Sequence, residues 1–119
     1  MYFFDTYALI EMSLENPNYR RFTDFTLVIT PLNFGEFYAY LIRTYGKETA
    51  TEKLGALSFK VLELKKEIMI EATEFKLADN KKKFSWADCV GYVSAQQRGL
   101  KFLTGDSEFK NLPNVKFVK

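Results

Sequence analysis

Short apolar runs alternate along this chain with longer segments of helical periodicity, and this alternation limits the folds that the chain can adopt. Strands are predicted at five apolar runs, residues 2–4, 27–29, 59–64, 100–103 and 115–118. Helices are predicted over residues 6–15, 31–45, 47–56, 65–79 and 86–98. Strands that alternate with helices pair in parallel, because each helix returns the chain to the same edge. The sequence therefore predicts an α/β fold, with one domain over residues 1–119 and a central parallel sheet of about five strands flanked by helices.

Local signals mark where several predicted helices begin and end. Thr30 followed by Pro31 is typical of a helix start, with a capping hydroxyl and then a proline that needs no amide partner. Apolar residues occur on nearly every side of the helix over 31–45, which predicts that this helix is buried. The lysines of the run 81–83 predict a solvated turn before the last long helix.

Composition excludes several classes of chemistry. The sequence contains no histidine and one cysteine, Cys89. Ser-His-Asp and Cys-His catalysis are therefore excluded, as are zinc sites with histidine ligands and internal disulfides. An enzyme with this sequence must use carboxylates, lysines, hydroxyls or a bound metal. The formal charge of +2 is too small to indicate a partner. Because no apolar run reaches the length of a membrane span and the N-terminus lacks a signal-peptide pattern, we expect a cytoplasmic protein without membrane contact.

Four acidic residues differ from those on the solvated helix faces. Asp5 and Asp106 each lie just beyond the carboxyl end of a predicted strand. In an open parallel sheet these ends line the crevice where ligands bind. Glu36 interrupts the most apolar of the predicted helices, and Asp88 lies in the first turn of another. We expect a parallel sheet to bring all four carboxylates to one edge.

Three of these residues also have a structural explanation. Asp5 can cap the helix that follows it, and Asp88 stands three residues after Ser85, as in a capping box. Asp106 can be a turn residue. Only Glu36 has no cap or helical partner that would explain it. The joint placement of the four residues at one edge favours a functional site.

A divalent cation would stabilise such a cluster. Carboxylates in apolar surroundings are costly unless they are paired, and several together raise one another's pKa. Oxygen ligands favour hard ions, Mg²⁺ or Mn²⁺, and four carboxylates can hold one or two of them. Paired metals about 3.5–4 Å apart activate water and stabilise the leaving oxygen in phosphodiester cleavage. The residues therefore point to metal-assisted hydrolysis of a nucleic acid.

Over essentially its whole length the chain resembles the PIN-domain ribonucleases, in particular the VapC-like toxins of prokaryotic toxin–antitoxin systems. The resemblance rests on the order and spacing of five short motifs. They are Phe4–Thr6, Thr30–Pro31, Gly35–Glu36, Ser85–Asp88 and Phe102–Phe109.

The resemblance implies a metal-dependent (Mg²⁺ or Mn²⁺) endoribonuclease that acts as a toxin. Its catalytic and metal-binding residues would be Asp5, Glu36, Asp88 and Asp106. Thr104 would support the last aspartate, and Glu108 falls where some members have an additional acid. The resemblance also implies a homodimer and an antitoxin protein that occupies a groove near the site. Candidates for contacts to RNA phosphates are Arg20, Arg21, Arg43 and Lys110, which flank the segments carrying the site, and ordinary solubilising surface is an equal explanation for each of them.

Other functions remain open. The chain could be a PIN nuclease of RNA processing or quality control, outside toxin systems. It could also be a catalytically inactive PIN module that binds RNA or protein, although all four acids argue against this. A phosphoacceptor receiver domain is disfavoured, because the first strand is followed by one acid only and no lysine follows Thr104-Gly105-Asp106.

Overall fold

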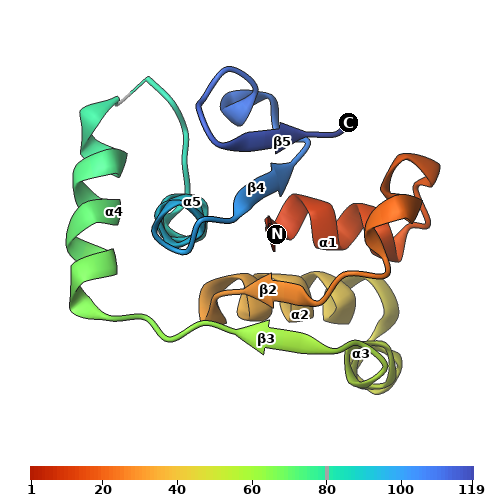
Figure 1. Cartoon of the computed structure of the whole chain (residues 1–119). Helices are drawn as coiled ribbons and strands as arrows, with labels where there is room; N and C mark the ends of the chain where they lie inside the picture. The colour runs from red at the N-terminus through yellow and green to blue at the C-terminus, as the bar shows by residue number, and fades with distance from the viewer. Residues whose placement is uncertain (80) are drawn as a thin grey trace.

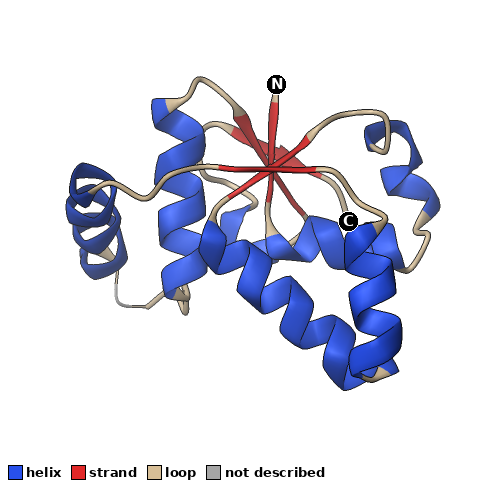
Figure 2. Cartoon of the chain, turned by 90° about the horizontal axis from the view of Figure 1, so that it is seen from below, coloured by secondary structure: helices blue, strands red, loops and turns tan. Residues whose placement is uncertain are grey.

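Five parallel strands form one sheet in the computed structural model, which describes residues 1–79 and 81–119 (Figure 1). The strands are β1 (Tyr2–Phe4), β2 (Leu27–Ile29), β3 (Phe59–Val61), β4 (Lys101–Thr104) and β5 (Val115–Phe117). Their order across the sheet is β3-β2-β1-β4-β5, and every pairing is parallel. Figure 2 shows the strong twist of the sheet, since the strands fan across one another. The predicted α/β fold class is confirmed.

Helices connect the strands and cover the sheet. They are α1 (Thr6–Ser13), α2 (Pro31–Tyr45), α3 (Lys47–Gly55), α4 (Lys66–Ala78) and α5 (Trp86–Gln97), with the 3₁₀ helices η1 (Pro17–Phe22) and η2 (Ser107–Phe109). Both predicted helix starts are correct, because Thr30 and Ser85 each cap their helix in a capping box. No helix of the described ranges is both long and apolar enough to span a membrane.

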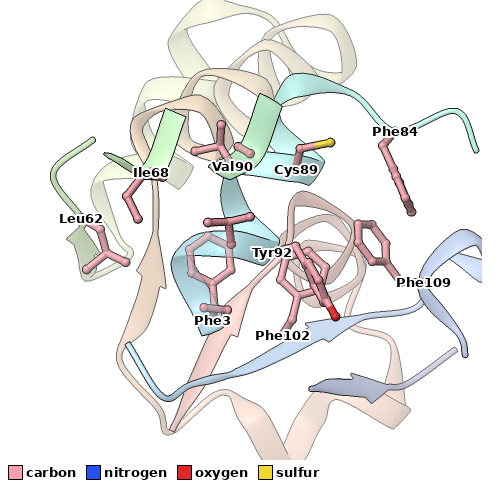
Figure 3. Packing of buried hydrophobic residues seen from close by; sticks show 12 residues of the cluster. Phe3, Leu62, Ile68, Phe84, Cys89, Val90, Tyr92, Phe102 and Phe109 are labelled. Carbon is pink, nitrogen blue, oxygen red and sulfur yellow. The ribbon is translucent and has the colours of Figure 1, made fainter. Parts of the chain in front are cut away.

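Alternate side chains of the central strands enter two separate cores. Phe3 and Phe102 point toward α4 and α5, where they stack with ring centroids 5.7 Å apart (Figure 3). Phe4 and Leu103, each one residue further, enter the core formed with α1, η1, α2 and α3. Both faces of the sheet are therefore covered, as the period of two along a strand requires.

Two predictions were wrong, one on how much of a helix is buried and one on the length of a strand. The helix over 31–45 is not buried all round, because only Asn33, Phe37 and Leu41 on it are buried and Glu36 is exposed. Its other apolar side chains form the partly exposed sides of a helix that packs on the sheet with one stripe. The strand predicted over 59–64 ends at Val61, which is 46% exposed, because β3 lies at an edge of the sheet.

Gly91 is where α5 approaches the sheet most tightly. A Cβ atom added at Gly91 would lie 2.9 Å from Cε1 of Phe3 and 3.3 Å from Cε1 of Phe102. Both rings are fully buried and stacked on each other, so neither can move aside easily. The absence of a side chain at this position is therefore what lets α5 lie against β1 and β4.

We predict that Gly91→Ala destabilises the fold by about 1–3 kcal/mol, since overpacking outweighs the gain in helix propensity. The matched control is Gly35→Ala in α2, where an added Cβ meets no atom within 4 Å. This control should gain up to about 1 kcal/mol from helix propensity alone. Urea unfolding followed by circular dichroism measures both changes, and equal stabilities would contradict the proposed contact.

Candidate functional site

The carboxyl edge of the sheet gathers the acidic residues that the sequence singled out. Asp5 follows β1 and Asp106 follows β4 by two residues, and these two strands are paired in parallel. Both residues therefore emerge at the same edge and side by side. Thr104, the last residue of β4, joins them: its hydroxyl donates to Asp5 Oδ2 at 2.7 Å and accepts from the Asp106 amide at 3.1 Å.

Asp5 is the most buried of the four acids, with 3% of its surface exposed. Its Oδ1 accepts from the amide of Thr6 at 2.9 Å, which is the helix cap expected from the sequence. Burial raises the pKa of Asp5 to about 7, and the negative charges of Asp88 and Asp106 contribute to the rise. Ionising a carboxyl group at this position is therefore costly without a positive charge nearby.

Asp88 lies half-buried in the first turn of α5. Its Oδ2 accepts from the Ser85 amide at 2.8 Å, which completes the expected capping box. Burial raises the pKa of Asp88, and the charges of Asp106 and Glu36 raise it further. Because the charges of Asp5, Asp88, Asp106 and Glu36 reach one another in this way, the four side chains form one electrostatic cluster, the acidic cluster.

Glu36 differs from what the sequence suggested. It is exposed rather than enclosed by apolar side chains. It also has a hydrogen-bond partner in another helix, since the Thr6 hydroxyl of α1 donates to Glu36 Oε1 at 2.7 Å. Glu36 therefore forms the open rim of the acidic cluster, whereas Asp5 forms its floor.

Two residues that were not among the predicted site residues, Thr6 and Asn33, support Glu36 through hydrogen bonds. Thr6 Oγ1 accepts from Asn33 Nδ2 at 3.1 Å, and Asn33 is fully buried. Asn33 is also the third residue of α2 and completes the capping box with Thr30. Asn33 stands three residues after Thr30, and this spacing is typical of a capping box. It is the sequence signal that could have located Asn33.

Glu108 and Cys89 lie near the acidic cluster but have other contacts. Glu108 Oε2 lies 4.0 Å from the Lys82 ammonium, so this acid has a cationic neighbour. Cys89 is completely buried, and burial raises the pKa of its thiol to about 11. The thiol therefore packs in the core and is not activated as a nucleophile.

The donor set of the acidic cluster suits a divalent cation. The single ion pair within 1–79 and 81–119 joins Lys82 to Glu108, so no lysine or arginine of this part of the chain pairs with the four carboxylates. Hydrogen bonds within these ranges occupy Asp88 Oδ2, Asp106 Oδ1 and Glu36 Oε1 and leave the other oxygen of each side chain free. In the same ranges no three acidic or cysteine side chains converge as a ready-made cage, so ligation requires these side chains to rotate. Hard oxygen ligands of this kind fit Mg²⁺ or Mn²⁺.

The buried Asp5 makes the stability of the metal-free protein depend on pH. Because the folded state raises the pKa of Asp5, folding is favoured when the carboxyl is protonated and loses stability as it ionises. We predict that stability falls between about pH 4, the pKa in the unfolded chain, and about pH 7, by on the order of a few kcal/mol. Asp5→Asn should remove most of this fall.

The measurement is urea unfolding in EDTA at pH 5 and pH 7.5. Asp24→Asn is the matched control, because Asp24 is an exposed acid three residues before β2 and therefore near the opposite edge of the sheet. The control should keep the pH dependence of the wild type. A pH dependence that is unchanged in Asp5→Asn would show that another group causes it.

Comparison with solved structures shows the same fold in toxin–antitoxin proteins. The toxin VapC20 of Mycobacterium tuberculosis, described as cleaving the sarcin–ricin loop, superposes with a TM-score of 0.82 at 14% identity, covering 100% of both chains. A chain of the DNA-bound VapBC complex of Salmonella typhimurium gives 0.74 at 18% identity, covering 98% of this chain and 95% of that one. A chain of Rickettsia felis VapBC2, bound to a promoter DNA fragment, gives 0.76 at 15% identity over 99% and 98%.

Identities this low establish a shared fold alone. A comparison with curated protein sequences found no match. The sequence profile of the PIN domain, however, matches residues 2–115 of the 119. This match spans β1 to β4 in full, reaches the first residue of β5 and contains all four members of the acidic cluster, and the protein therefore belongs to the PIN domain family.

Proposed function

We propose that the protein is a metal-dependent endoribonuclease that hydrolyses RNA phosphodiester bonds at the acidic cluster. The observation that carries the proposal is the buried carboxyl of Asp5, whose pKa is raised by burial and by the charges of Asp88 and Asp106, while no lysine or arginine among the described residues forms an ion pair with these acids. Such an arrangement is unfavourable as a structural feature and favourable as a cation site.

Asp5, Glu36, Asp88 and Asp106 would hold one or two Mg²⁺ or Mn²⁺ ions. When bound, a divalent ion supplies an activated water and stabilises the negative charge that develops on the phosphate. The protein's own residues orient the ligands: Thr104 fixes Asp5 Oδ2, and Thr6 fixes Asp5 Oδ1 and Glu36 Oε1. The buried Asp5 would hold an ion at the floor of the site, and the exposed Glu36 would leave access for substrate from the rim.

We further propose that the whole chain acts as the toxin of a VapBC-type pair in the cytoplasm, as a homodimer controlled by a protein antitoxin. The support is the PIN domain family together with the likeness to VapC and VapBC structures, one of which is described as a toxin that cleaves the sarcin–ricin loop. Exposed apolar side chains such as Ile70 and Leu77 on α4 provide surface for protein contacts.

We predict that Asp5→Asn and Asp106→Asn each lower RNA cleavage by at least about a hundredfold while the fold is retained. Loss of one carboxylate weakens the ion site and removes charge that the ion needs. Calorimetric titration with Mg²⁺ or Mn²⁺ should show weakened binding in both variants, and cleavage of a structured RNA should fall in parallel. Asp24→Asn serves again as the control and should bind and cleave like the wild type.

The outcomes separate the alternatives. Full cleavage by Asp5→Asn would contradict the proposed site. A wild-type protein that neither binds millimolar metal nor cleaves RNA would be a binding module, in which the acids are structural. Cleavage without any antitoxin encoded next to the gene would favour an RNA-processing or quality-control nuclease instead.

Thr104 provides a test of ligand orientation. We predict that Thr104→Val, which removes the donor to Asp5 and the acceptor for the Asp106 amide, lowers metal affinity or cleavage by about 10–100-fold. Thr104→Ser keeps the hydroxyl and should recover most of both. If the serine and valine variants lose equal activity, packing of the threonine methyl rather than its hydrogen bonds is responsible.

A further inference from the structure

An exposed tryptophan stands next to the acidic cluster. Trp86 is the first residue of α5, and 47% of it is exposed, although tryptophan is highly buried on average. Asp88 lies two residues further along the same helix, which is about 3 Å along its axis. A flat aromatic surface is thus available to solvent in the same helical turn that carries Asp88, although side chains two residues apart project in different directions around the helix axis.

One lysine lies over this tryptophan, and a run of three lysines, residues 81–83, precedes it in the chain. The Lys76 ammonium, on α4, lies 5.4 Å from the centre of the Trp86 ring and donates to the backbone oxygen of Phe84. The Lys82 ammonium donates at 2.8 Å to the backbone oxygen of Glu108, in the 3₁₀ helix that follows Asp106. Lys81 and Lys83 are exposed. Lys76 therefore lies on the Trp86 side of this segment, Lys82 reaches the 3₁₀ helix that follows Asp106, and the other two lysines are neighbours of Lys82 in the chain.

Phe84 anchors this segment to the core. Its ring is buried and packs against Phe75, at 5.4 Å between centroids. It also packs against Phe109, at 4.5 Å (Figure 3). Ser85 then caps α5. The residues on either side of Phe84 are consequently held at fixed positions with their side chains at the surface, rather than forming only a solvated turn.

Positive charge is concentrated in this part of the chain. Residues 76–86 contain four lysines and one aspartate, a net charge of about +3 from standard side-chain ionisation, whereas the whole chain carries +2. The four carboxylates beside it would repel a polyanion. A nucleic acid that reaches the acidic cluster therefore needs a cationic surface at its side, and this segment supplies one.

We propose that Lys76, Lys81, Lys82, Lys83 and Trp86, the lysine–tryptophan strip, bind single-stranded RNA next to the scissile bond, with one base stacked on the indole. This inference rests on the proposed ribonuclease function and names how its substrate is held. Alternating cationic and aromatic side chains are the features with which proteins bind single strands, because phosphates pair with the cations while unstacked bases cover the rings. In a duplex the bases are already stacked, so the strip selects single-stranded segments.

The first test uses the fact that Trp86 is the only tryptophan of the chain. Titration of the full-length protein with a short single-stranded RNA in EDTA, where cleavage is prevented, should quench tryptophan fluorescence. The same RNA annealed to its complement should quench much less. Binding measured by anisotropy of a labelled RNA should weaken about tenfold in Trp86→Ala and by less than about threefold in Trp86→Phe, which keeps a ring.

The matched control is Tyr45→Ala. Tyr45 is also exposed and also has a lysine over its ring, Lys53 at 4.7 Å, but it lies at the far end of α2 from the acidic cluster. Its loss should leave RNA affinity unchanged. In Mg²⁺, Trp86→Ala should raise KM for a single-stranded substrate about tenfold with little change in kcat, because the indole holds the substrate and does not touch the reacting atoms.

The second test concerns the lysines. Replacing Lys81 and Lys83 together by glutamine should reduce the slope of log affinity against log salt by about 1.4, since each contact to a single strand contributes about 0.7. Lys65 and Lys66 are exposed lysines at the opposite end of α4, and their replacement should leave the slope unchanged.

Two results would overturn the inference and can be told apart. If fluorescence is unchanged and Trp86→Ala binds RNA like the wild type, while Asp5→Asn still abolishes cleavage, the strip has no role in RNA binding and the ribonuclease function stands. If the wild type neither binds nor cleaves single-stranded RNA, and quenching occurs only with a protein partner, both the strip's assignment to RNA and the proposed function fail.

Discussion

The carboxyl of Asp5, buried where β1 and β4 end, is the constraint on which the site depends. Parallel pairing of these strands brings Asp5 beside Thr104, and the Thr104 hydroxyl links Asp5 to the amide of Asp106. Burial raises the pKa of Asp5 to about 7, so the fold is less stable at neutral pH than it would be with a neutral side chain there. Under the proposed function, this loss of stability accompanies a position at which a cation would bind.

The same arrangement explains the unequal exposure of the four acids. Asp5 is buried, Asp88 and Asp106 are half-buried, and Glu36 is exposed. Each of the four also accepts a hydrogen bond from a nearby amide or hydroxyl. The structural explanations considered for Asp5 and Asp88, a helix cap and a capping box, are therefore correct, and they coexist with membership of the acidic cluster. A capping side chain uses one oxygen of Asp88, and the other stays available.

The packing of α4 against α5 holds the segment that leads into the acidic cluster. Phe84, held between Phe75 and Phe109, is part of the core under α5, and it also determines where the chain enters that helix. Trp86 and the neighbouring lysines are close to Phe84 in the chain. The packing of Phe84 in the core therefore helps to position these charged and aromatic side chains at the surface. In the sequence these lysines suggested a solvated turn, since charge and spacing alone do not indicate which residues anchor the loop.

The sequence by itself determined the alternation of strands and helices, the helix starts at Thr30 and Ser85, and the presence of acids after β1 and β4. These features depend on periodicity and capping within a few residues, which are local properties of the chain. The tertiary structure decided that Glu36 is exposed and bound by Thr6, that Asn33 supports Thr6, and that Lys76 covers Trp86. The hydrogen bonds from Thr6 to Glu36 and from Thr104 to Asp5 join residues 30 and 99 positions apart. Contacts of this range arise from the packing of whole elements, and no local pattern encodes them.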